Sequence, residues 1–311
     1  MRPIRVACFS RGQACQKSLH RVCETEINMA LFTDTDSYWA ESPSHILKKR
    51  LLCEGDSWFS IPSIAHIPLQ LEALLDASIL CLADPGDTLE ELTAGLQFKK
   101  IKTLLASERF GQKWDALLLS VGGNDVIGPE IRGLLNAPAD PASTNPDHYL
   151  NQEAVEQMFA VLDERLRQII GLRDQSPINR EMPIFIHTYS YLTPRDEGHK
   201  VLAWRISGPW IHRYMVPLGI TDCSLQQAIV AKLLDGFHGR LERIADETNE
   251  FHVIDTRKSL EPVLCRNRKG SQKLWRDEIH PSRKGFARIA KSFFVPALLK
   301  AGVITDADLR R

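Results

Sequence analysis

The sequence predicts an α/β fold, in which helices cover both faces of a doubly wound, five-stranded parallel sheet. Short apolar runs alternate along the chain with longer amphipathic segments, which is typical of strands joined by helical crossovers. Small polar motifs follow the first three runs, and an open parallel sheet binds its ligands at these carboxyl ends. With 311 residues, the chain can bury a large core as one big domain or two modest ones.

The predicted strands are short and apolar. They cover about 50–53, 78–83, 116–121, 183–189 and 251–255. Apolar runs of this length, separated by helical patterns, favour strands that are buried in a parallel sheet.

Helical patterns fill most of the intervals between these strands. They cover 88–107, 152–172 and 224–248, and a last helix is expected to open at Pro281–Ser282. Its apolar residues recur at helical spacing, at Phe286, Ile289, Ala290 and Phe293.

Three segments depart from this alternation. Residues 1–46 lack a clear pattern and are expected to be an extension packed on the main domain, which covers 47–311. Two long loops are expected at 128–151, which is rich in proline, and at 193–222, which is rich in glycine, proline and large apolar residues. Loops of this length tend to be lids or binding loops, or to be disordered.

Composition excludes several classes of protein. Lys+Arg and Asp+Glu number 39 each, so no overall basic field would attract nucleic acid or anionic lipid. The seven cysteines include no C-x-x-C pair, which predicts reduced thiols. No apolar stretch approaches the roughly 20 residues of a membrane helix, and no secretory signal is apparent. We therefore expect a cytoplasmic protein without stable membrane insertion, although a dedicated machinery could still export it.

Four polar motifs are expected to meet at one edge of the sheet. Three follow the first three strands and the fourth precedes the last helix: Gly55-Asp56-Ser57, Pro85-Gly86-Asp87-Thr88, Gly122-Gly123-Asn124 and Asp277-x-x-His280. A Gly-Asp-Ser sequence alone is usually only a turn. The order and convergence of the four motifs favour a reactive site more strongly than any one of them.

The residue types in these motifs match the needs of acyl transfer. Ser57 is the candidate nucleophile and His280 the candidate base that takes its proton. Asp277 lies three residues before His280 and can orient the imidazole ring. Backbone N–H groups of Ser57 and Gly86, together with the side-chain amide of Asn124, would form an oxyanion hole. No His, Asp or Glu cluster has metal-ligand spacing, so we expect no metal and no cofactor.

These motifs resemble those of the SGNH (GDSL-type) hydrolases, a family with a serine, a glycine, an asparagine and a histidine in four separate blocks. The resemblance covers about residue 51 to the C-terminus. It implies a flavodoxin-like sheet with Ser57 as nucleophile, His280 as base and Asp277 as its orienting acid. It also implies that Gly86 and Asn124 are oxyanion-hole donors. The second block departs from the family pattern, because Pro85 stands where a small residue is commoner.

Several polar residues near these motifs have simpler interpretations. Asp56 is expected to organise its loop as a hydrogen-bond acceptor, and Glu278 to be solvated. Asp277 could instead cap the helix near Pro281, a role that Ser282 could also fill.

Three further histidines have no comparable motif around them. His187 lies inside the fourth strand and is expected to be a hydrogen-bonded core or edge residue. His199 and His212 lie in the second long loop and could contact a substrate.

Large apolar side chains near the motifs are candidates for lining a substrate pocket. In the 193–222 loop they include Trp204 and Trp210, and Trp58 follows the candidate nucleophile. They could form an apolar lid or acyl-chain pocket, or simply complete the core.

The predicted function is hydrolysis of carboxylic esters through an acyl-enzyme intermediate, in the manner of an esterase, lipase or lysophospholipase. The expected partner is a small-molecule or lipid-like ester. A carbohydrate O-deacetylase could use the same site, and a catalytically silent binding module is the alternative of another class. The complete set of Ser57, Asn124, Asp277 and His280 argues against the silent module.

Overall fold

The protein was analysed as a computed structural model. It describes residues 31–40, 48–61, 65–106, 112–201, 204–270 and 272–310, without the side chains of 201 and 204–206. Most of the predicted extension over 1–46 lies outside the described residues. The division of the chain at residue 46 stays a prediction.

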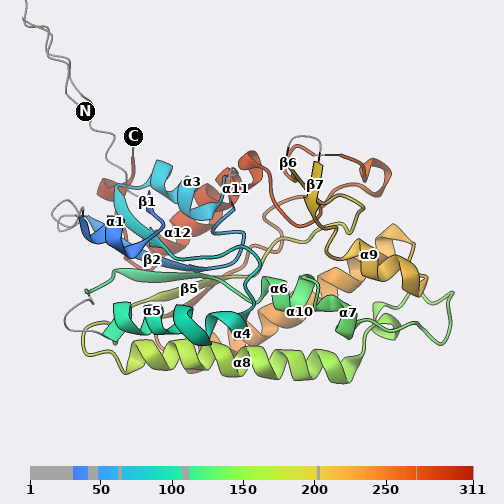
Figure 1. The fold of residues 1–311 in the computed structure, drawn as a ribbon, viewed down its shortest axis with the longest axis horizontal. Helices are drawn as coiled ribbons and strands as arrows, with labels where there is room; N and C mark the ends of the chain where they lie inside the picture. The colour runs from blue at the N-terminus through green and yellow to red at the C-terminus, as the bar shows by residue number, and fades with distance from the viewer. Residues whose placement is uncertain are drawn as a thin grey trace, which may run out of the picture.

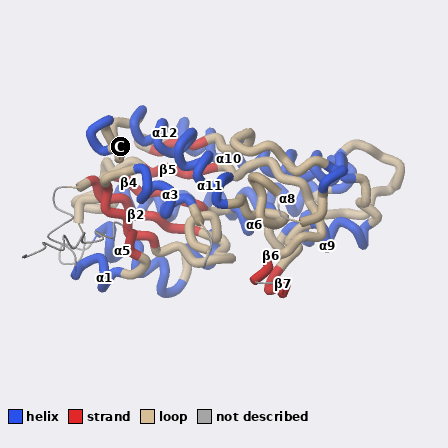
Figure 2. The backbone as a smooth tube through the Cα atoms, turned by 90° about the horizontal axis from the view of Figure 1, so that it is seen from above, coloured by secondary structure: helices blue, strands red, loops and turns tan. Residues whose placement is uncertain are grey.

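A six-stranded parallel sheet forms the centre of the fold (Figures 1 and 2). Its strands are β1 (Leu31–Phe32), β2 (Lys49–Gly55), β3 (Ala77–Cys81), β4 (Ala116–Ser120), β5 (Ile184–His187) and β8 (Phe251–Ile254). Their order is β1-β3-β2-β4-β5-β8, and every neighbouring pair is parallel. From β2 the chain adds β3 on one side and then β4, β5 and β8 on the other, so the sheet is doubly wound, as the sequence predicts; the first strand, β1, lies beyond β3.

The sheet has one strand more than the five expected. The additional strand β1 pairs with β3 through Leu31 and Phe32. A strand of two residues is too short to produce a recognisable run in the sequence.

Helices cover both faces of the sheet, so the strands are buried on both sides (Figure 1). On one face lie α3 (Ile67–Leu74), α11 (Arg283–Ile289) and α12 (Val295–Lys300), with a π-helical turn at Ala290–Phe294. On the other lie α4 (Leu89–Leu92), α5 (Gly95–Ala106), α8 (Gln152–Asp174) and α10 (Cys223–Glu247). In the described segments, no helix combines the length and the apolar character needed to cross a bilayer.

One predicted helix is divided in the structure. The pattern over 88–107 forms α4 and α5, with a break at Thr93–Ala94. Thr88 starts α4 with a capping box. The Thr88 side chain accepts the Glu91 backbone N–H, and the Glu91 side chain accepts the Thr88 backbone N–H. At the far end the Thr93 hydroxyl donates to the Leu89 carbonyl, which competes with continuation of the helix.

The two predicted long loops contain short regular elements. Residues 128–151 include α7 (Ile131–Leu134) and a 3₁₀ turn at Pro146–Tyr149. Residues 193–222 include the antiparallel hairpin of β6 (His199–Val201) and β7 (Trp204–Ser207), followed by α9 (His212–Met215) and a 3₁₀ turn at Val216–Leu218. Elements of three or four residues are too short to show a period in the sequence. The remaining short helices are α1 (Thr35–Ala40), α6 (Gly123–Ile127) and 3₁₀ turns at Cys265–Asn267 and Asp306–Asp308.

The cysteines differ from the expectation of reduced thiols. Cys223 and Cys265 form a disulfide, with Cα atoms 5.9 Å apart, although they are 42 residues apart in the sequence. Among the described cysteines, Cys53 and Cys81 are free and buried. The prediction of reduced thiols was wrong because tertiary folding, and not local spacing, brings the pair together. This pairing removes the cysteine argument for a reducing compartment.

Candidate active site

Ser57 lies in the turn that follows β2. Gly55 ends this strand at φ +143°, and a Cβ atom there would lie 2.1 Å from the Ser120 carbonyl oxygen. Only glycine allows this close approach between β2 and β4. The Asp56 N–H donates to that same carbonyl at 2.8 Å, and the chain then turns to present Ser57.

His280 and Asp277 complete a continuous hydrogen-bonded relay with this serine. His280 Nε2 lies 2.8 Å from Ser57 Oγ, and His280 Nδ1 lies 2.9 Å from both carboxylate oxygens of Asp277. All three side chains are buried. The sequence separates Ser57 and His280 by 223 residues, and the fold brings them into contact.

Asp277 is held in its ionised form. Burial alone would raise the pKa of this carboxyl, but the charge of His280 and the hydrogen bonds from His280 and the Ile279 N–H together lower it. Of the two caps that the sequence offered for the last helix, Ser282 is the one found, because its side chain accepts the Gly285 N–H at the start of α11.

Gly86 and Asn124 lie beside Ser57 on neighbouring loops. All three line one cavity of about 200 Å³. Asn124 is in α6, which follows β4, and its side-chain amide donates to the Asp87 carbonyl at 2.8 Å. The amide has a second N–H, so this bond orients the group and leaves one donor available.

Asp56 organises the loop beneath the nucleophile, as its interpretation from the sequence proposed. Its Oδ1 accepts the Trp58 N–H at 2.9 Å and the Ser120 hydroxyl at 2.7 Å, and its Oδ2 accepts the Tyr189 hydroxyl at 2.6 Å. Burial raises the pKa of Asp56 to about 6, against the effect of these hydrogen bonds. The loops after β2 and β5 are therefore joined to β4 below Ser57.

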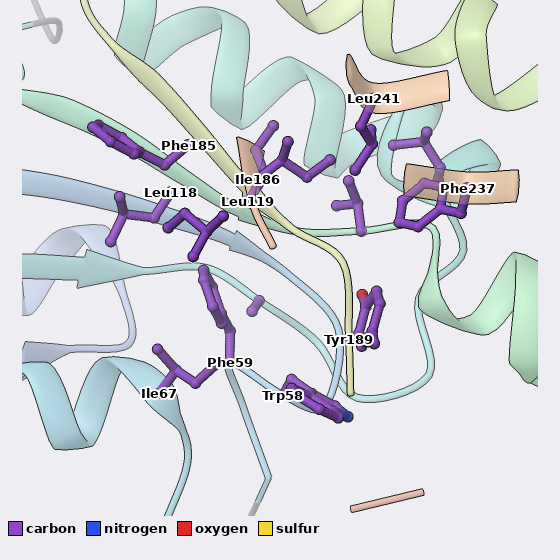
Figure 3. Close-up of a cluster of buried hydrophobic side chains, with 14 of the residues drawn as sticks. Trp58, Phe59, Ile67, Leu118, Leu119, Phe185, Ile186, Tyr189, Phe237 and Leu241 are labelled. Carbon is purple, nitrogen blue, oxygen red and sulfur yellow. The ribbon is translucent and has the colours of Figure 1, made fainter. Parts of the chain in front are cut away.

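Trp58 belongs to the core and does not line the cavity. Its side chain is 2% exposed and packs against His187 and Phe286. It also packs against Tyr189, which lies beside it in Figure 3. Its Nε1–H donates to the Ile279 carbonyl at 3.2 Å, which ties the nucleophile loop to the histidine segment. Of the two alternatives that the sequence left open for Trp58, its position favours a place in the core over a contact with substrate. Its apolar neighbours in the core outweigh its adjacency to Ser57 in the sequence.

Glu278 is buried and was wrongly expected to be solvated. Its carboxylate accepts four backbone N–H groups, those of Arg195 (3.1 Å), Ile211 (2.9 Å), His212 (2.7 Å) and Trp210. Burial raises the pKa of this carboxyl to about 7, although these four bonds oppose the shift. No local pattern could have shown this role, because the four donors lie 66 to 83 residues earlier in the chain.

The histidines named from the sequence take different places. His187 is a core residue, and burial lowers its pKa to about 3. His199 lines the cavity, with its Nδ1 3.8 Å from Asp277 Oδ2. His212 is not among the residues that line this cavity.

The large apolar residues of the 193–222 segment are divided between core and cavity. Ile211, Met215 and Ile220 are fully buried and complete the core. Trp210 lines the cavity, and its ring lies nearly perpendicular to that of His280 with centroids 5.0 Å apart. Trp204 is in β7, but its side chain lies outside the described residues.

The cavity is small and has mixed walls. Apolar atoms come from Ile61, Pro85, Trp210 and Ile279. Polar side chains come from the serine and histidine of the relay and from Asn124, His199 and Ser207. Within the segments that the structure describes, no group of three or more His, Cys, Asp or Glu residues could hold a metal ion.

The fold and this relay define an α/β protein in which a serine is hydrogen-bonded to a histidine–aspartate pair at the carboxyl edge of the sheet. Among solved structures, the chain is similar to a phospholipase A1 from Streptomyces albidoflavus, with a TM-score of 0.47 and 14% identity over 81% of this chain and 99% of that one. It is also similar to an extracellular lipase from Streptomyces rimosus (TM-score 0.43, 13% identity, 81% and 99% covered). A family 3 carbohydrate esterase from Clostridium thermocellum is a third such structure (TM-score 0.41, 14% identity, 82% and 99% covered).

These likenesses are too weak to assign a family or an activity to the chain. No protein-family model and no curated protein matches the sequence. A function for this chain therefore has to be inferred from the geometry of the site itself.

Proposed function

We propose that this protein is a serine ester hydrolase of the SGNH type that works through an acyl-enzyme intermediate. The observation that supports this most directly is the relay from Ser57 Oγ through His280 to Asp277, which opens into the cavity. A serine, a histidine base and a carboxylate that orients it are the groups that acyl transfer requires.

In the acylation step, Ser57 Oγ attacks the carbonyl carbon of the ester and forms a new C–O bond. His280 Nε2 takes the hydroxyl proton, and Asp277 stabilises the imidazolium that results. When the tetrahedral intermediate collapses, the bond to the alcohol oxygen breaks and His280 gives its proton to that oxygen. Water then attacks the acyl-enzyme in the same way, which releases the acid and restores Ser57.

Negative charge on the former carbonyl oxygen needs fixed donors. The backbone N–H groups of Ser57 and Gly86 and the free N–H of the Asn124 amide are the proposed donors, since all three residues line the cavity. Loss of one such donor typically lowers turnover by about 10²–10³-fold.

The proposed substrate is a carboxylic ester of a small molecule. A lipid-like ester and an O-acetylated carbohydrate are both chemically compatible with the relay. The cavity of about 200 Å³ is below the ordinary range for drug-sized ligands, and it favours a short acyl group.

The test is labelling with a fluorophosphonate probe together with hydrolysis of p-nitrophenyl acetate, butyrate and octanoate. The wild-type protein should be labelled and should hydrolyse acetate at least as well as octanoate, whereas Ser57→Ala should lose both activities. Ser143→Ala is a matched control, because Ser143 also lies 2.8 Å from a histidine nitrogen, that of His148, but on the exposed surface. Labelling that survives Ser57→Ala would refute the nucleophile, and a wild-type protein with neither activity would favour the silent binding module.

A further inference from the structure

The direction of proton transfer divides the cavity into two sides, provided that the proposed function holds. His280 must give its proton to the oxygen of the leaving alcohol, so the alcohol part of the ester has to lie on the His280 side of Ser57. The acyl part then lies away from His280. Among the residues that line the cavity, Ile61 follows β2 and Pro85 follows β3, and we assign the acyl part to them.

Two aromatic side chains flank His280. Trp210 lies with its ring centroid 5.0 Å from that of His280, and His199 with its centroid 6.4 Å away. Both line the cavity. The side on which the alcohol leaves is therefore built by the 193–222 segment.

Ser207 brings a hydroxyl to the same place. It pairs with His199 in the β6–β7 hairpin, which stands beyond the sheet in both views (Figures 1 and 2). Paired residues of an antiparallel ladder project to the same face, and both residues line the cavity. This side of the cavity thus combines an indole ring with two hydrogen-bonding side chains.

The ring of His199 packs beside Asp277 without a hydrogen bond between Nδ1 and that carboxylate. Its Nδ1 is buried and has no hydrogen-bond partner among the described residues, since Asp277 Oδ2 lies 3.8 Å away. Burial, with a smaller effect of the Arg276 charge, lowers the pKa of His199. The ring is therefore neutral near pH 7 and offers one donor and one acceptor.

Both ends of the hairpin are fixed against the relay. The Glu278 carboxylate accepts the N–H of Arg195, which precedes β6, and the N–H groups of Trp210 and Ile211, which follow β7. The Glu278 N–H in turn donates to the Glu197 carbonyl at 3.0 Å. The residue beside Asp277 in the chain thus sets the position of the hairpin relative to His280.

We propose that Trp210, His199 and Ser207 form the subsite for the alcohol part of the ester, and that this subsite selects alcohols that carry further hydroxyl groups. An indole ring can cover the apolar face of a sugar or glycerol unit. The imidazole and the hydroxyl can bond its remaining hydroxyl groups, which an alkyl alcohol does not offer. The favoured substrates are short-chain esters of sugars or glycerol.

Two matched substrate series test this subsite. The first keeps the acetyl group and compares glycerol monoacetate and a methyl glucoside monoacetate with hexyl acetate. The second keeps glycerol and varies the acyl group from acetate to butyrate to octanoate. We expect kcat/KM to be about tenfold higher for the hydroxylated acetates than for hexyl acetate, because the site would hydrogen-bond the substrate hydroxyls.

Three variants are compared in both series. His199→Leu and Ser207→Ala should each lower the preference for hydroxylated alcohols by about fivefold, through KM more than kcat, and should leave the acyl-chain profile unchanged. His238→Leu is the control. The exposed fraction of the His238 side chain, on α10, is similar to that of His199, but His238 does not line the cavity. Circular dichroism checks that each variant is folded, and Ser207→Ala changes only an exposed hydroxyl group.

The outcomes separate the two proposals. A wild-type protein that is labelled at Ser57 but hydrolyses hexyl acetate as well as the hydroxylated acetates overturns the subsite and leaves the ester hydrolase standing. Equal losses for all alcohols in both variants also overturn it. A wild-type protein without labelling or hydrolysis overturns the ester hydrolase, and the subsite with it.

Discussion

Ser57 and His280 lie 2.8 Å apart, yet different parts of the fold hold them in place. Ser57 follows directly from β2, and the Asp56 carboxylate below it is bonded to side chains at the ends of β4 and β5. His280 lies between β8 and α11, and the neighbouring Glu278 is bonded to backbone N–H groups of the 193–222 segment. The sheet therefore fixes Ser57, the proposed nucleophile, whereas loops fix His280, the proposed base.

This difference has consequences for stability and turnover. The sheet strands form the core, so changes beneath Ser57 should lower stability and turnover together. Loops can open without unfolding of the core, so changes around Glu278 should alter turnover and specificity more than global stability. Five substitutions test this contrast: Asp277→Asn, Asp56→Asn with the milder Tyr189→Phe, Glu278→Gln and Glu54→Gln.

Asp277→Asn should have the largest effect. An amide can no longer stabilise the imidazolium and favours the wrong tautomer of His280, so kcat should fall by about 10³–10⁴-fold. Steady-state kinetics with p-nitrophenyl acetate measure the change. Asp76→Asn is the control, because Asp76 is exposed and paired with Lys48. If the Asp277→Asn variant kept a tenth of the wild-type kcat, Asp277 would not have the role in catalysis that the relay implies.

Asp56→Asn tests the nucleophile side. The amide cannot accept all the bonds that Ser120, Tyr189 and the Trp58 N–H donate to the carboxylate, so the free energy of unfolding should fall by about 1–3 kcal/mol. A shift of Ser57 should also lower kcat/KM by about 10²-fold. Urea unfolding and kinetics measure the two effects.

Tyr189→Phe removes only the hydroxyl that donates to Asp56 Oδ2. It should therefore lower the free energy of unfolding and kcat/KM less than Asp56→Asn does. If Asp56→Asn lowered kcat/KM and left the free energy of unfolding unchanged, the sheet would not be what holds the nucleophile.

Glu278→Gln tests the base side. An NH2 group, which donates and cannot accept, replaces one carboxylate oxygen, so two of the four backbone N–H groups lose their partner. We expect kcat/KM to fall by about tenfold, and the amides of Ile211 and His212 to exchange faster with solvent. The amides of β4 should keep their protection in hydrogen-exchange measurements.

Glu153→Gln is the control, because Glu153 is exposed in the first turn of α8. It should change neither kcat/KM nor the exchange rates of these amides. Equal loss of protection in β4 and in the 193–222 segment would mean that Glu278 supports the whole fold and not the loop.

The sequence predicted the parts of this molecule that depend on local pattern. The strands from β2 to β8 produce apolar runs of four to seven residues, and the residues of the relay come at their ends or before α11. The parallel sheet class and the proximity of Ser57 and His280 followed from these runs.

The missed features depend on contacts between distant residues. The Cys223–Cys265 disulfide and the burial of Glu278 leave no local trace in the sequence, since each partner lies tens of residues away. The hairpin of β6 and β7 escaped because its short strands, His-Lys-Val and Trp-Arg-Ile-Ser, contain charged and polar residues and so form no apolar run. For Trp58 the sequence left two alternatives, a substrate contact beside Ser57 or a place in the core, and its ring packs into the core.

Glu54→Gln should have the smallest effect on turnover. Its effect on the free energy of unfolding should depend on pH. Glu54 is the residue of β2 before Gly55, and its Oε2 is buried without a hydrogen-bond partner among the described residues. Burial raises the pKa of its carboxyl from 4.5 to about 8, and the charges of Asp87 and Asp84 add to the shift, although hydrogen bonds from Gln97 and the Gly55 N–H oppose it.

The folded protein therefore holds this proton to a higher pH than the unfolded chain. Well below pH 4.5 the group is protonated in both states and contributes no pH dependence. As the pH rises towards about 8 the unfolded chain releases its proton first, so the free energy of unfolding of the wild type falls, and the loss is complete above that value. Glutamine does not titrate, so Glu54→Gln should be less stable relative to the wild type at pH 5 than at pH 9. Urea unfolding at the two pH values measures this difference, and an unchanged difference would show that Glu54 is not the group that makes the nucleophile side sensitive to pH.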